Sequence, residues 1–492
     1  MKRLTTEEVA LAQHPKGLVE LDGRELEGGG QLVRIAVCLS ALTGQPLRIS
    51  RIRGRRPGGG GLKAQHLACV EWLAKACNAT THGAEKGSKT LFFEPGTGTY
   101  GDREGGMGDV FEKVTKEGKE VWEAKIDIGT VGATGLALQA VLPFVLFQRR
   151  YLKEALPVHL TISGGTNVSG SPSFDYIDQV LVPMLGRIGF KSMTTKLGKR
   201  GWSQGSPGLG SFTLEIPAST KKLPLPAFQL SQYPQPDNGG TNRTRVVKLT
   251  ATVIAPLAFH DHFRDRLDTY KQTGRKLANT PLEIKCEDSG HSKRWYLLIV
   301  AEINSSISLV DPQTGLMKPH SKNPHKPSFL GRDWLYDRKL PNDVSGFAKV
   351  VDLICGRVLQ NILDNVESEG TVDEFMRDQM VMFQALAAGR SAVWPGWHET
   401  DDEIDPGFCP AWVRKASMHA RTAEWVCGKM LGVKFEGQEM NHEVACDGIG
   451  YGGEEDWIKA RRAERLAEYK AARKECDEDP SFGLWEPPEW RY

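Results

Sequence analysis

The residue best suited to nucleophilic chemistry is a histidine near the start of a late helix. His419 lies in the stretch KASMHARTAEWVCGKMLG, residues 415–432. Apolar residues follow it at helical spacing and predict one buried face of a helix over 419–431: Ala423, Val426, Cys427, Met430 and Leu431. His419 lies one turn before this face, on the inward side or in the turn that leads to it. A lone histidine there is more often a structural or capping residue than a chemical one.

A second candidate is a basic segment that ends in four glycines, RISRIRGRRPGGGGLKAQH. Six cations occur there before the next acid, Glu71: Arg48, Arg51, Arg53, Arg55, Arg56 and Lys63. Guanidinium groups suit two-pronged contact with phosphate, and a glycine loop lets a phosphate approach the backbone. The charge pattern alone is equally consistent with an exposed basic loop.

A glycine-rich turn comes earlier, in LDGRELEGGGQLVRIAVCLSALTG. A strand and an Asp22-Gly23 turn precede three glycines and a helix, an arrangement that can hold an anion at a helix N-terminus. The glycine spacing matches neither a Walker A motif nor a dinucleotide fingerprint. Glu27 could serve such a site by binding a divalent cation that also binds the phosphate. Alternatively, Glu27 has only a structural role, as an acid that the dipole at the helix N-terminus favours.

Three polar residues interrupt otherwise apolar helices. Gln139 lies within DIGTVGATGLALQA, and Asp378 and Gln379 lie between Met376 and Met380. A carboxylate in such surroundings is costly unless it is paired, bound to a ligand or next to a cavity.

The elements that must position these residues alternate along the chain, which predicts an α/β or α+β fold. Helical patterns cover 31–43, 62–78, 132–149, 173–189, 249–272, 346–367, 372–389 and 419–431. Strand patterns cover 47–52, 90–95, 157–163, 212–217 and 294–303. The pairs of helices before residue 190, each introduced by a glycine-rich turn, indicate a repeated unit of roughly eighty residues.

Composition predicts an intracellular protein. The 492 residues carry a net charge of +2, so binding to nucleic acid requires a local patch. The nine cysteines form no CxxC pair, which favours a reducing compartment and disfavours structural zinc. The sequence shows neither a signal peptide nor an apolar run long enough to span a membrane.

Four regions are predicted: a large domain over 1–220, a smaller inserted domain over 221–368, the rest of the large domain over 369–438, and a polar tail over 439–492. The composition changes near residue 220, and 304–345 is rich in Pro, Lys, His and Asn with little periodicity. Beyond Glu436 the chain has few apolar positions, which is typical of a solvated tail.

Several segments, in this order, resemble the RNA 3'-terminal phosphate cyclase family. They are LDGRELEGGGQLVRIAVCLSALTG, RIRGRRPGGGGLKAQHLACVEWLAKAC, DIGTVGATGLALQAVLPFVLF, GGTNVSGSPSFDY, KRGWSQGSPGLGSF, VDEFMRDQMVMFQALA and SMHARTAEWV. They cover most of 18–217 and 369–435. The resemblance implies a large domain of three βαβαββ-type units with a smaller inserted α/β domain.

The resemblance also implies an activity and a location. His419 would attack ATP to form a histidyl–AMP intermediate, the adenylyl group would pass to an RNA 3'-phosphate, and the 2'-hydroxyl would displace AMP to give a 2',3'-cyclic phosphate. The nucleotide would be bordered by Gln139, Pro172, Phe375, Asp378 and Gln379. Phosphate or RNA would contact Arg34, Arg53, Arg56 and Gln65, and Glu27 would hold Mg²⁺ or Mn²⁺. The protein would act in the nucleus or the cytoplasm, on RNA ends and not on membranes.

The sequence departs from the family pattern in places, and two other functions stay open. Phe375 occupies a position where the family usually has tyrosine, and the RRPGGGGL loop is one residue longer than usual. One alternative is a non-catalytic ribosome-assembly factor, a branch that lacks the nucleophilic histidine; His419, with Arg421 and Thr422 in register, disfavours it. The other is a small-molecule transferase without a preference for RNA ends.

Overall fold

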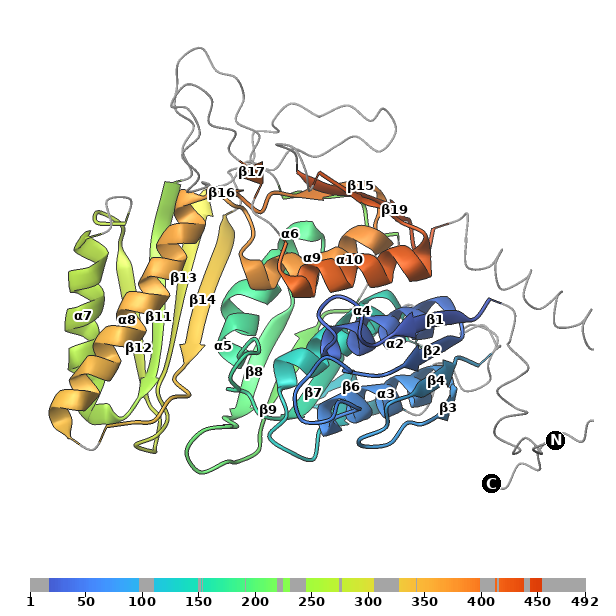
Figure 1. Cartoon of the computed structure of the whole chain (residues 1–492), viewed down its shortest axis with the longest axis horizontal. Coiled ribbons are helices and arrows are strands. Elements are labelled where there is room, and N and C mark those ends of the chain that lie inside the picture. Colours follow the sequence, from blue (N-terminus) through green and yellow to red (C-terminus); the bar gives the residue numbers. More distant parts are fainter. Residues whose placement is uncertain are drawn as a thin grey trace, which may run out of the picture.

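The protein has the predicted mixed α/β architecture, with a smaller part at one end of its long axis (Figure 1). The computed structural model describes residues 17–96, 110–148, 152, 154–190, 192–218, 224–230, 245–273, 277–304, 327–341, 343–398, 412–413, 416–437 and 443–453. Within them, no helix is long and apolar enough to cross a membrane.

The first sheet contains β1 (Val19–Asp22), β2 (Leu47–Ser50), β3 (Thr80–His82) and β4 (Leu91–Glu94), in the order β1-β2-β4-β3. Helices α2 (Gly30–Thr43) and α3 (Ala64–Cys77) connect β1 to β2 and β2 to β3. Strands β1 and β2 are parallel, and β4 is antiparallel to both of its neighbours.

The second sheet repeats this arrangement with one extra edge strand, β5 (Glu112–Lys116). Its strands β6 (Lys119–Asp127), β7 (Val158–Gly164), β8 (Thr194–Lys199) and β9 (Gly210–Ile216) lie in the order β5-β6-β7-β9-β8. Helix α4 (Thr134–Gln148) connects β6 to β7. A broken helix connects β7 to β8: α5 (Phe174–Tyr176), the π-helical turn Ile177–Leu181, and α6 (Val182–Ile188).

The third sheet has the same order again: β10 (Gln229–Leu230), β15 (Ala388–Val393), β19 (Val444–Ile449) and β18 (Phe435–Glu436). Helix α9 (Glu374–Leu386) precedes β15, and α10 (Met418–Leu431) precedes β18. A short ribbon, β16 (Trp397–His398) paired with β17 (Trp412–Val413), lies between β15 and α10. In all three sheets the first two strands of the repeated part are parallel and the remaining pairs are antiparallel.

The smaller part interrupts the third sheet between β10 and α9. Its sheet has the order β12-β11-β13-β14, formed by β11 (Arg245–Ala255), β12 (Leu282–Asp288), β13 (Tyr296–Asn304) and β14 (Ser328–Leu335). Helices α7 (His260–Thr273), preceded by a 3₁₀ turn at Leu257–Phe259, and α8 (Val344–Glu367) pack on this sheet and share a hydrophobic core with it.

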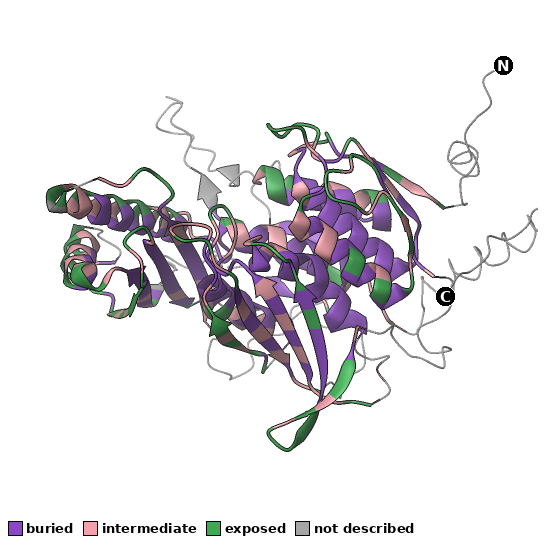
Figure 2. Ribbon diagram, turned by 90° about the horizontal axis from the view of Figure 1, so that it is seen from below, coloured by how far each residue is buried: buried purple, intermediate pink, exposed green. Residues whose placement is uncertain are grey.

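Helices α2 and α4 of the large part are buried almost along their whole length, and buried residues prevail among the central helices, purple in Figure 2. In α4 every residue from Ala137 to Gln148 is buried. A helix that is apolar on all sides must be enclosed, and α4 packs against α2, α3 and α9 between the sheets. This explains why Gln139 occurs where the surrounding sequence is apolar.

Four details of the sequence-based description are wrong. Strand β10 belongs to the third sheet, so the boundary at residue 220 moves beyond Leu230. The first part of the predicted helix 249–272 is strand β11, because its β-branched and apolar residues are buried in a sheet. Strand β14 lies within the segment 304–345 that was predicted to be irregular. Strand β19 and the buried Tyr451 lie in the predicted tail 439–492, whose residues 454–492 are outside the described part.

Candidate active site

The N-terminus of α2 forms one wall of the site, and its glycines make room for side chains. A Cβ atom on Gly29 would lie 2.2 Å from Oε1 of Glu27, and one on Gly30 would lie 2.4 Å from Nε2 of His66. Gly28 has a φ of +59°, a conformation that favours glycine. The three consecutive glycines therefore bring Glu27 and His66 against the start of α2.

His419 lies directly opposite, in the first turn of α10. Ser417 caps this helix, its Oγ accepting a hydrogen bond of 3.1 Å from the backbone N–H of Ala420. The His419 side chain is 49% exposed. It therefore does not lie on the buried face of α10, which Ala423, Val426 and the other predicted apolar residues do form. It projects from the helix end, where a ligand could reach it.

Glu27 and His419 are in direct contact. Oε2 of Glu27 lies 3.5 Å from Nδ1 of His419, and the Glu27 side chain is only 6% exposed. The backbone N–H of Glu27 also donates to Oγ1 of Thr422, at 3.3 Å, which ties the loop before α2 to α10. Because Nδ1 faces a carboxylate, it is the nitrogen that carries the proton, and the lone pair of a neutral ring lies on Nε2.

Charge and burial shift the pKa values of this pair in opposite directions. Burial raises the pKa of Glu27, but the hydrogen bond to His419 and the ion pair with Arg56 outweigh it and hold that pKa at about 2. The hydrogen bond to Glu27 raises the pKa of His419 above its usual value, against the opposing effect of burial. Glu27 is therefore a carboxylate, and His419 keeps its proton to a higher pH than a free histidine.

The basic segment divides into two groups. Arg56 forms an ion pair with Glu27. Arg53 donates from Nη1 to the carbonyl of Gly61 at 3.3 Å, and the charges of Arg56 and Glu27 act on its pKa, which burial lowers, so both arginines lie at the site. Arg51 instead forms an ion pair with Asp22 at 2.6 Å. Likewise, Arg24 pairs with Asp22 and Arg48 pairs with Glu20. These acids come from β1 and its end, so part of the segment is ordinary ion-paired surface.

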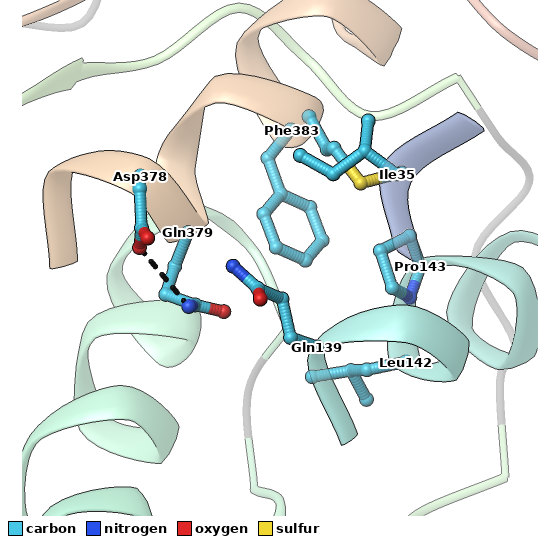
Figure 3. A pocket seen from close by; sticks show the side chains of 8 residues that line it. Ile35, Gln139, Leu142, Pro143, Asp378, Gln379 and Phe383 are labelled. Carbon is cyan, nitrogen blue, oxygen red and sulfur yellow. Dashed lines mark hydrogen bonds between the residues drawn. The ribbon is translucent and has the colours of Figure 1, made fainter. Parts of the chain in front are cut away.

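A buried polar network continues from α2 into α4 and α9. Nε of Arg34 donates to Oε1 of Gln139 at 3.0 Å, and Nη2 of Arg34 donates to Oε1 of Gln31 at 2.5 Å. Gln31 makes a long contact of 3.5 Å with Oδ2 of Asp378. Gln379 donates to Oδ1 of Asp378 at 3.1 Å (Figure 3). The network brings Arg34, Gln139, Asp378 and Gln379 together.

Asp378 is electrostatically unusual. Burial raises its pKa to about 7, although the charges of His419 and Arg34 oppose the shift. Asp378, Gln379 and Gln139 line a cavity of about 10 Å³ together with Ile35, Leu142, Pro143, Met382 and Phe383 (Figure 3). A volume of this size holds one water molecule and no nucleobase.

Three predicted residues lie at the margin of this group. Oε1 of Gln65 accepts from the backbone N–H of Ala133 at 3.0 Å, just before α4. The carbonyl of Pro172 lies 2.2 Å from the position of a Cβ on Gly135, so it packs on the start of α4. The ring of Phe375, in the first turn of α9, lies edge-on to Tyr176 with ring centres 5.8 Å apart.

His66 lies at the site although the sequence analysis did not single it out. Its Nδ1 accepts from the backbone N–H of Lys63 at 3.1 Å, so Nε2 carries the proton and points towards Gly30. Burial and the nearby charges of Arg34 and Arg53 lower its pKa to about 3, which keeps the ring neutral. The only signal in the sequence was its place in the first turn of the helix after the four glycines.

The site offers few protein ligands to a divalent cation. In the described part of the chain, no three His, Cys, Asp or Glu side chains converge on one point. Glu27 is the one predicted metal ligand, and Arg56 already contacts its Oε1. Magnesium commonly binds one or two carboxylates and completes its shell with water and substrate phosphates. Among the described residues the site therefore offers a divalent cation Glu27 alone, and such a cation would need further ligands from water or a bound phosphate group.

Several known proteins are similar to this chain over most of its length. A protein of Methanosarcina acetivorans named RNA 3'-terminal phosphate cyclase is 28% identical over 433 residues, 87% of this chain and 100% of the relative. The Pyrococcus furiosus protein of the same name is 29% identical over 85% of this chain and 95% of the relative. One from Methanosarcina mazei is 40% identical over 185 residues, 38% of this chain and 44% of the relative. Residues 25–437, from the loop that holds Glu27 to the end of the strand after α10, match the model of one family. The chain belongs to the RNA 3'-terminal phosphate cyclase family.

Proposed function

We propose that this protein converts an RNA 3'-terminal phosphate into a 2',3'-cyclic phosphate with ATP, through a histidyl–AMP intermediate on His419. The observation that carries the proposal is the contact between Glu27 and Nδ1 of His419, which leaves Nε2 as the free nucleophile. Family membership and the names of the relatives support the same activity.

In the first step Nε2 of His419 attacks the α-phosphorus of ATP. A P–N bond forms, the P–O bond to the β-phosphate breaks, and pyrophosphate leaves. Glu27 stabilises the positive charge that develops on the ring, because its carboxylate faces Nδ1–H. Arg56 and Arg53 would neutralise charge on the phosphates, and the N-termini of α2 and α10 would add favourable dipoles.

In the second step an oxygen of the RNA 3'-phosphate attacks the same phosphorus, the P–N bond breaks, and His419 is restored. The 2'-hydroxyl oxygen then attacks the RNA phosphorus and AMP leaves; the hydroxyl proton passes to solvent or to a nearby base. Mg²⁺ or Mn²⁺ bound to the triphosphate and Glu27 would supply further charge neutralisation.

The nucleotide is expected to border Gln139, Pro172, Phe375, Asp378 and Gln379. The cavity beside Gln139 is too small for adenine, so we place the base against its rim, between α4 and α9. Arg34 and Gln65 would act indirectly. Arg34 orients the side chains of Gln139 and Gln31, and Gln65 fixes the backbone of the loop before α4. A nuclear location gains no support from the relatives, because those compared are archaeal.

Incubation with ATP labelled at the α-phosphorus tests the proposal. We expect label on the protein that is labile in acid and stable in base, as a P–N bond is, and its transfer to RNA that ends in a 3'-phosphate. His419→Ala should lose both the labelled protein and the cyclic product, because no neighbouring group supplies an equivalent nitrogen. Cyclic ends formed by His419→Ala would disprove the mechanism. A wild type that forms no adenylate but binds ribosomal precursors would support the non-catalytic alternative.

A further inference from the structure

Among the contacts between the inserted part and the catalytic part, two neighbouring residues of β14 reach the start of α9. The backbone N–H of Gly331 donates to Oδ2 of Asp373 at 2.8 Å. Arg332 reaches Glu374 and Phe375. Next to them, Oδ2 of Asp333 accepts from the hydroxyl of Tyr296 at 3.0 Å within the inserted part, and that hydroxyl is hydrogen-bonded to Oγ of Ser173 in the second repeated unit. The first two of these contacts are made to the residues that begin α9.

Asp373 caps α9 while it holds the inserted part. Its Oδ1 accepts from the backbone N–H of Met376 at 2.8 Å and from the hydroxyl of Tyr176, also at 2.8 Å. A side chain on Gly331 would not fit, because a Cβ atom there would lie 2.7 Å from Val180 and 2.9 Å from Tyr176. The start of α9 is thus fixed between the second repeated unit and β14.

Arg332 makes the contacts that reach towards the site. Its guanidinium carbon lies 5.2 Å from the centre of the Phe375 ring, and Nη2 lies 3.1 Å from Oε2 of Glu374. The Arg332 side chain is only 9% exposed. Its Nε is buried without a hydrogen-bond partner in the described part of the chain. A buried donor left without a partner is unfavourable, so the position of this arginine is set by the ring and Glu374.

We infer that Arg332 is a positioning residue through which the inserted domain sets the ATP affinity of the site. This inference rests on the proposed function. Phe375, Asp378 and Gln379 follow one another at i, i+3 and i+4, so they share one face of α9. Arg332 covers the Phe375 ring and restrains the first turn of that face. Through it, the inserted domain determines how the nucleotide-bordering residues of α9 are held.

A planar guanidinium is suited to this position. It can stack over an aromatic ring and donate to a carboxylate at the same time, whereas a lysine ammonium donates as a compact point charge. Arg332→Lys should therefore keep part of the effect and Arg332→Met should lose it. Arg357 provides a matched control, because its guanidinium carbon lies 4.3 Å from the Trp334 ring wholly within the inserted part.

Two measurements test the inference. In steady-state assays, Arg332→Met should raise KM for ATP about three- to tenfold, the range expected for a lost cation–π contact at a partly buried site. Both kcat and KM for RNA should change less than about twofold, and Arg357→Met should leave all three unchanged. In hydrogen exchange, the first turn of α9 should exchange faster in Arg332→Met than in Arg357→Met.

The outcomes separate the two proposals. Unchanged exchange at α9, or equal effects of both arginine variants, would overturn the positioning role. Faster exchange with an unchanged KM for ATP would overturn its link to the nucleotide. A wild type that forms no adenylate would refute the proposed function, and with it the link to ATP, while the exchange data would still decide whether Arg332 restrains α9.

Discussion

The carboxylate of Glu27 lies 3.5 Å from Nδ1 of His419 and joins two parts of the chain that are far apart in sequence. Glu27 precedes the first helix of the first repeated unit, and His419 begins the second helix of the third. Each residue changes the ionisation of the other, so the pair responds to pH as a unit.

Glu27→Gln should shift the acid limb of adenylate formation to lower pH. His419 must be neutral to attack, so wild-type activity falls as pH drops through the raised pKa of His419. Glutamine keeps an oxygen near Nδ1 but removes the charge, and the pKa of His419 should fall towards its usual value. The rate of labelling at a series of pH values measures the shift. Glu25→Gln, at an exposed position in the same loop, is the control, and an acid limb that stays in place would contradict the role of Glu27.

Arg56→Ala should slow adenylate formation by about a hundredfold, the effect of removing one charge-stabilising group from a transition state. Folding stability should change by less than about 0.5 kcal/mol, because the Arg56 side chain is 42% exposed. Arg51→Ala removes an arginine from the same segment that is paired with Asp22 instead. Single-turnover labelling and thermal melts of both variants test this. Equal rates of adenylate formation in the two variants would show that Arg56 is an ordinary surface residue.

Asp378→Asn should stabilise the folded protein more at pH 8 than at pH 5. Because the pKa of Asp378 is raised to about 7, the folded state binds this proton more tightly than the unfolded state. Stability is then lost as pH rises from the unfolded value, near 4, through about 7. Asparagine removes this loss. Urea denaturation across that range provides the measurement, and a difference between variant and wild type that does not vary with pH would argue against the raised pKa.

Two truncated chains should show that β19 contributes to folding stability and that the residues after Gly453 contribute little. A chain that ends at Gly437 lacks β19, with the buried Val444, Ala445 and Cys446, as well as Tyr451. Each large apolar side chain contributes about 1.5–3 kcal/mol when buried, so this chain should unfold or melt far below wild type. A chain that ends at Gly453 keeps every one of these contacts and should melt close to wild type. Similar melting temperatures for the two truncations would show that β19 contributes little.

The sequence was sufficient to predict the long helices. In 31–43, 346–367 and 419–431 the apolar periodicity spans several turns and gives nearly the observed bounds. Shorter strands were missed: β10 has two residues and β18 has two, too few for a pattern to repeat. Strand β11 was mistaken for helix because every residue in its second half, from Ala251 to Ala255, is buried, and a strand buried on both faces lacks the alternation that would distinguish it.

The candidate site was predictable in residue types and less so in contacts. Glycines beside Glu27, and polar residues within apolar helices, pointed to the chemistry. The sequence did not show that Arg56 and Arg51 have different partners. That difference arises because Asp22 lies beside Arg51 across the β1–β2 pair. The role of Arg332 was also hidden, since β14 lies in a segment whose composition suggested no regular structure.

The interruption of the third sheet also constrains how the protein folds during synthesis. The first two repeated units are contiguous in the chain, so each can acquire its strand pairs as it emerges from the ribosome. Strand β10 pairs with β15 through Gln229–Ala392 and Leu230–Val393, so it must wait until the whole inserted domain and α9 have been made. At about 5–20 residues per second this delay lasts many seconds. During that time the apolar side chains of α2 and α4 that will pack against α9 and α10 are uncovered, so the nascent chain at this stage is the natural client for a chaperone.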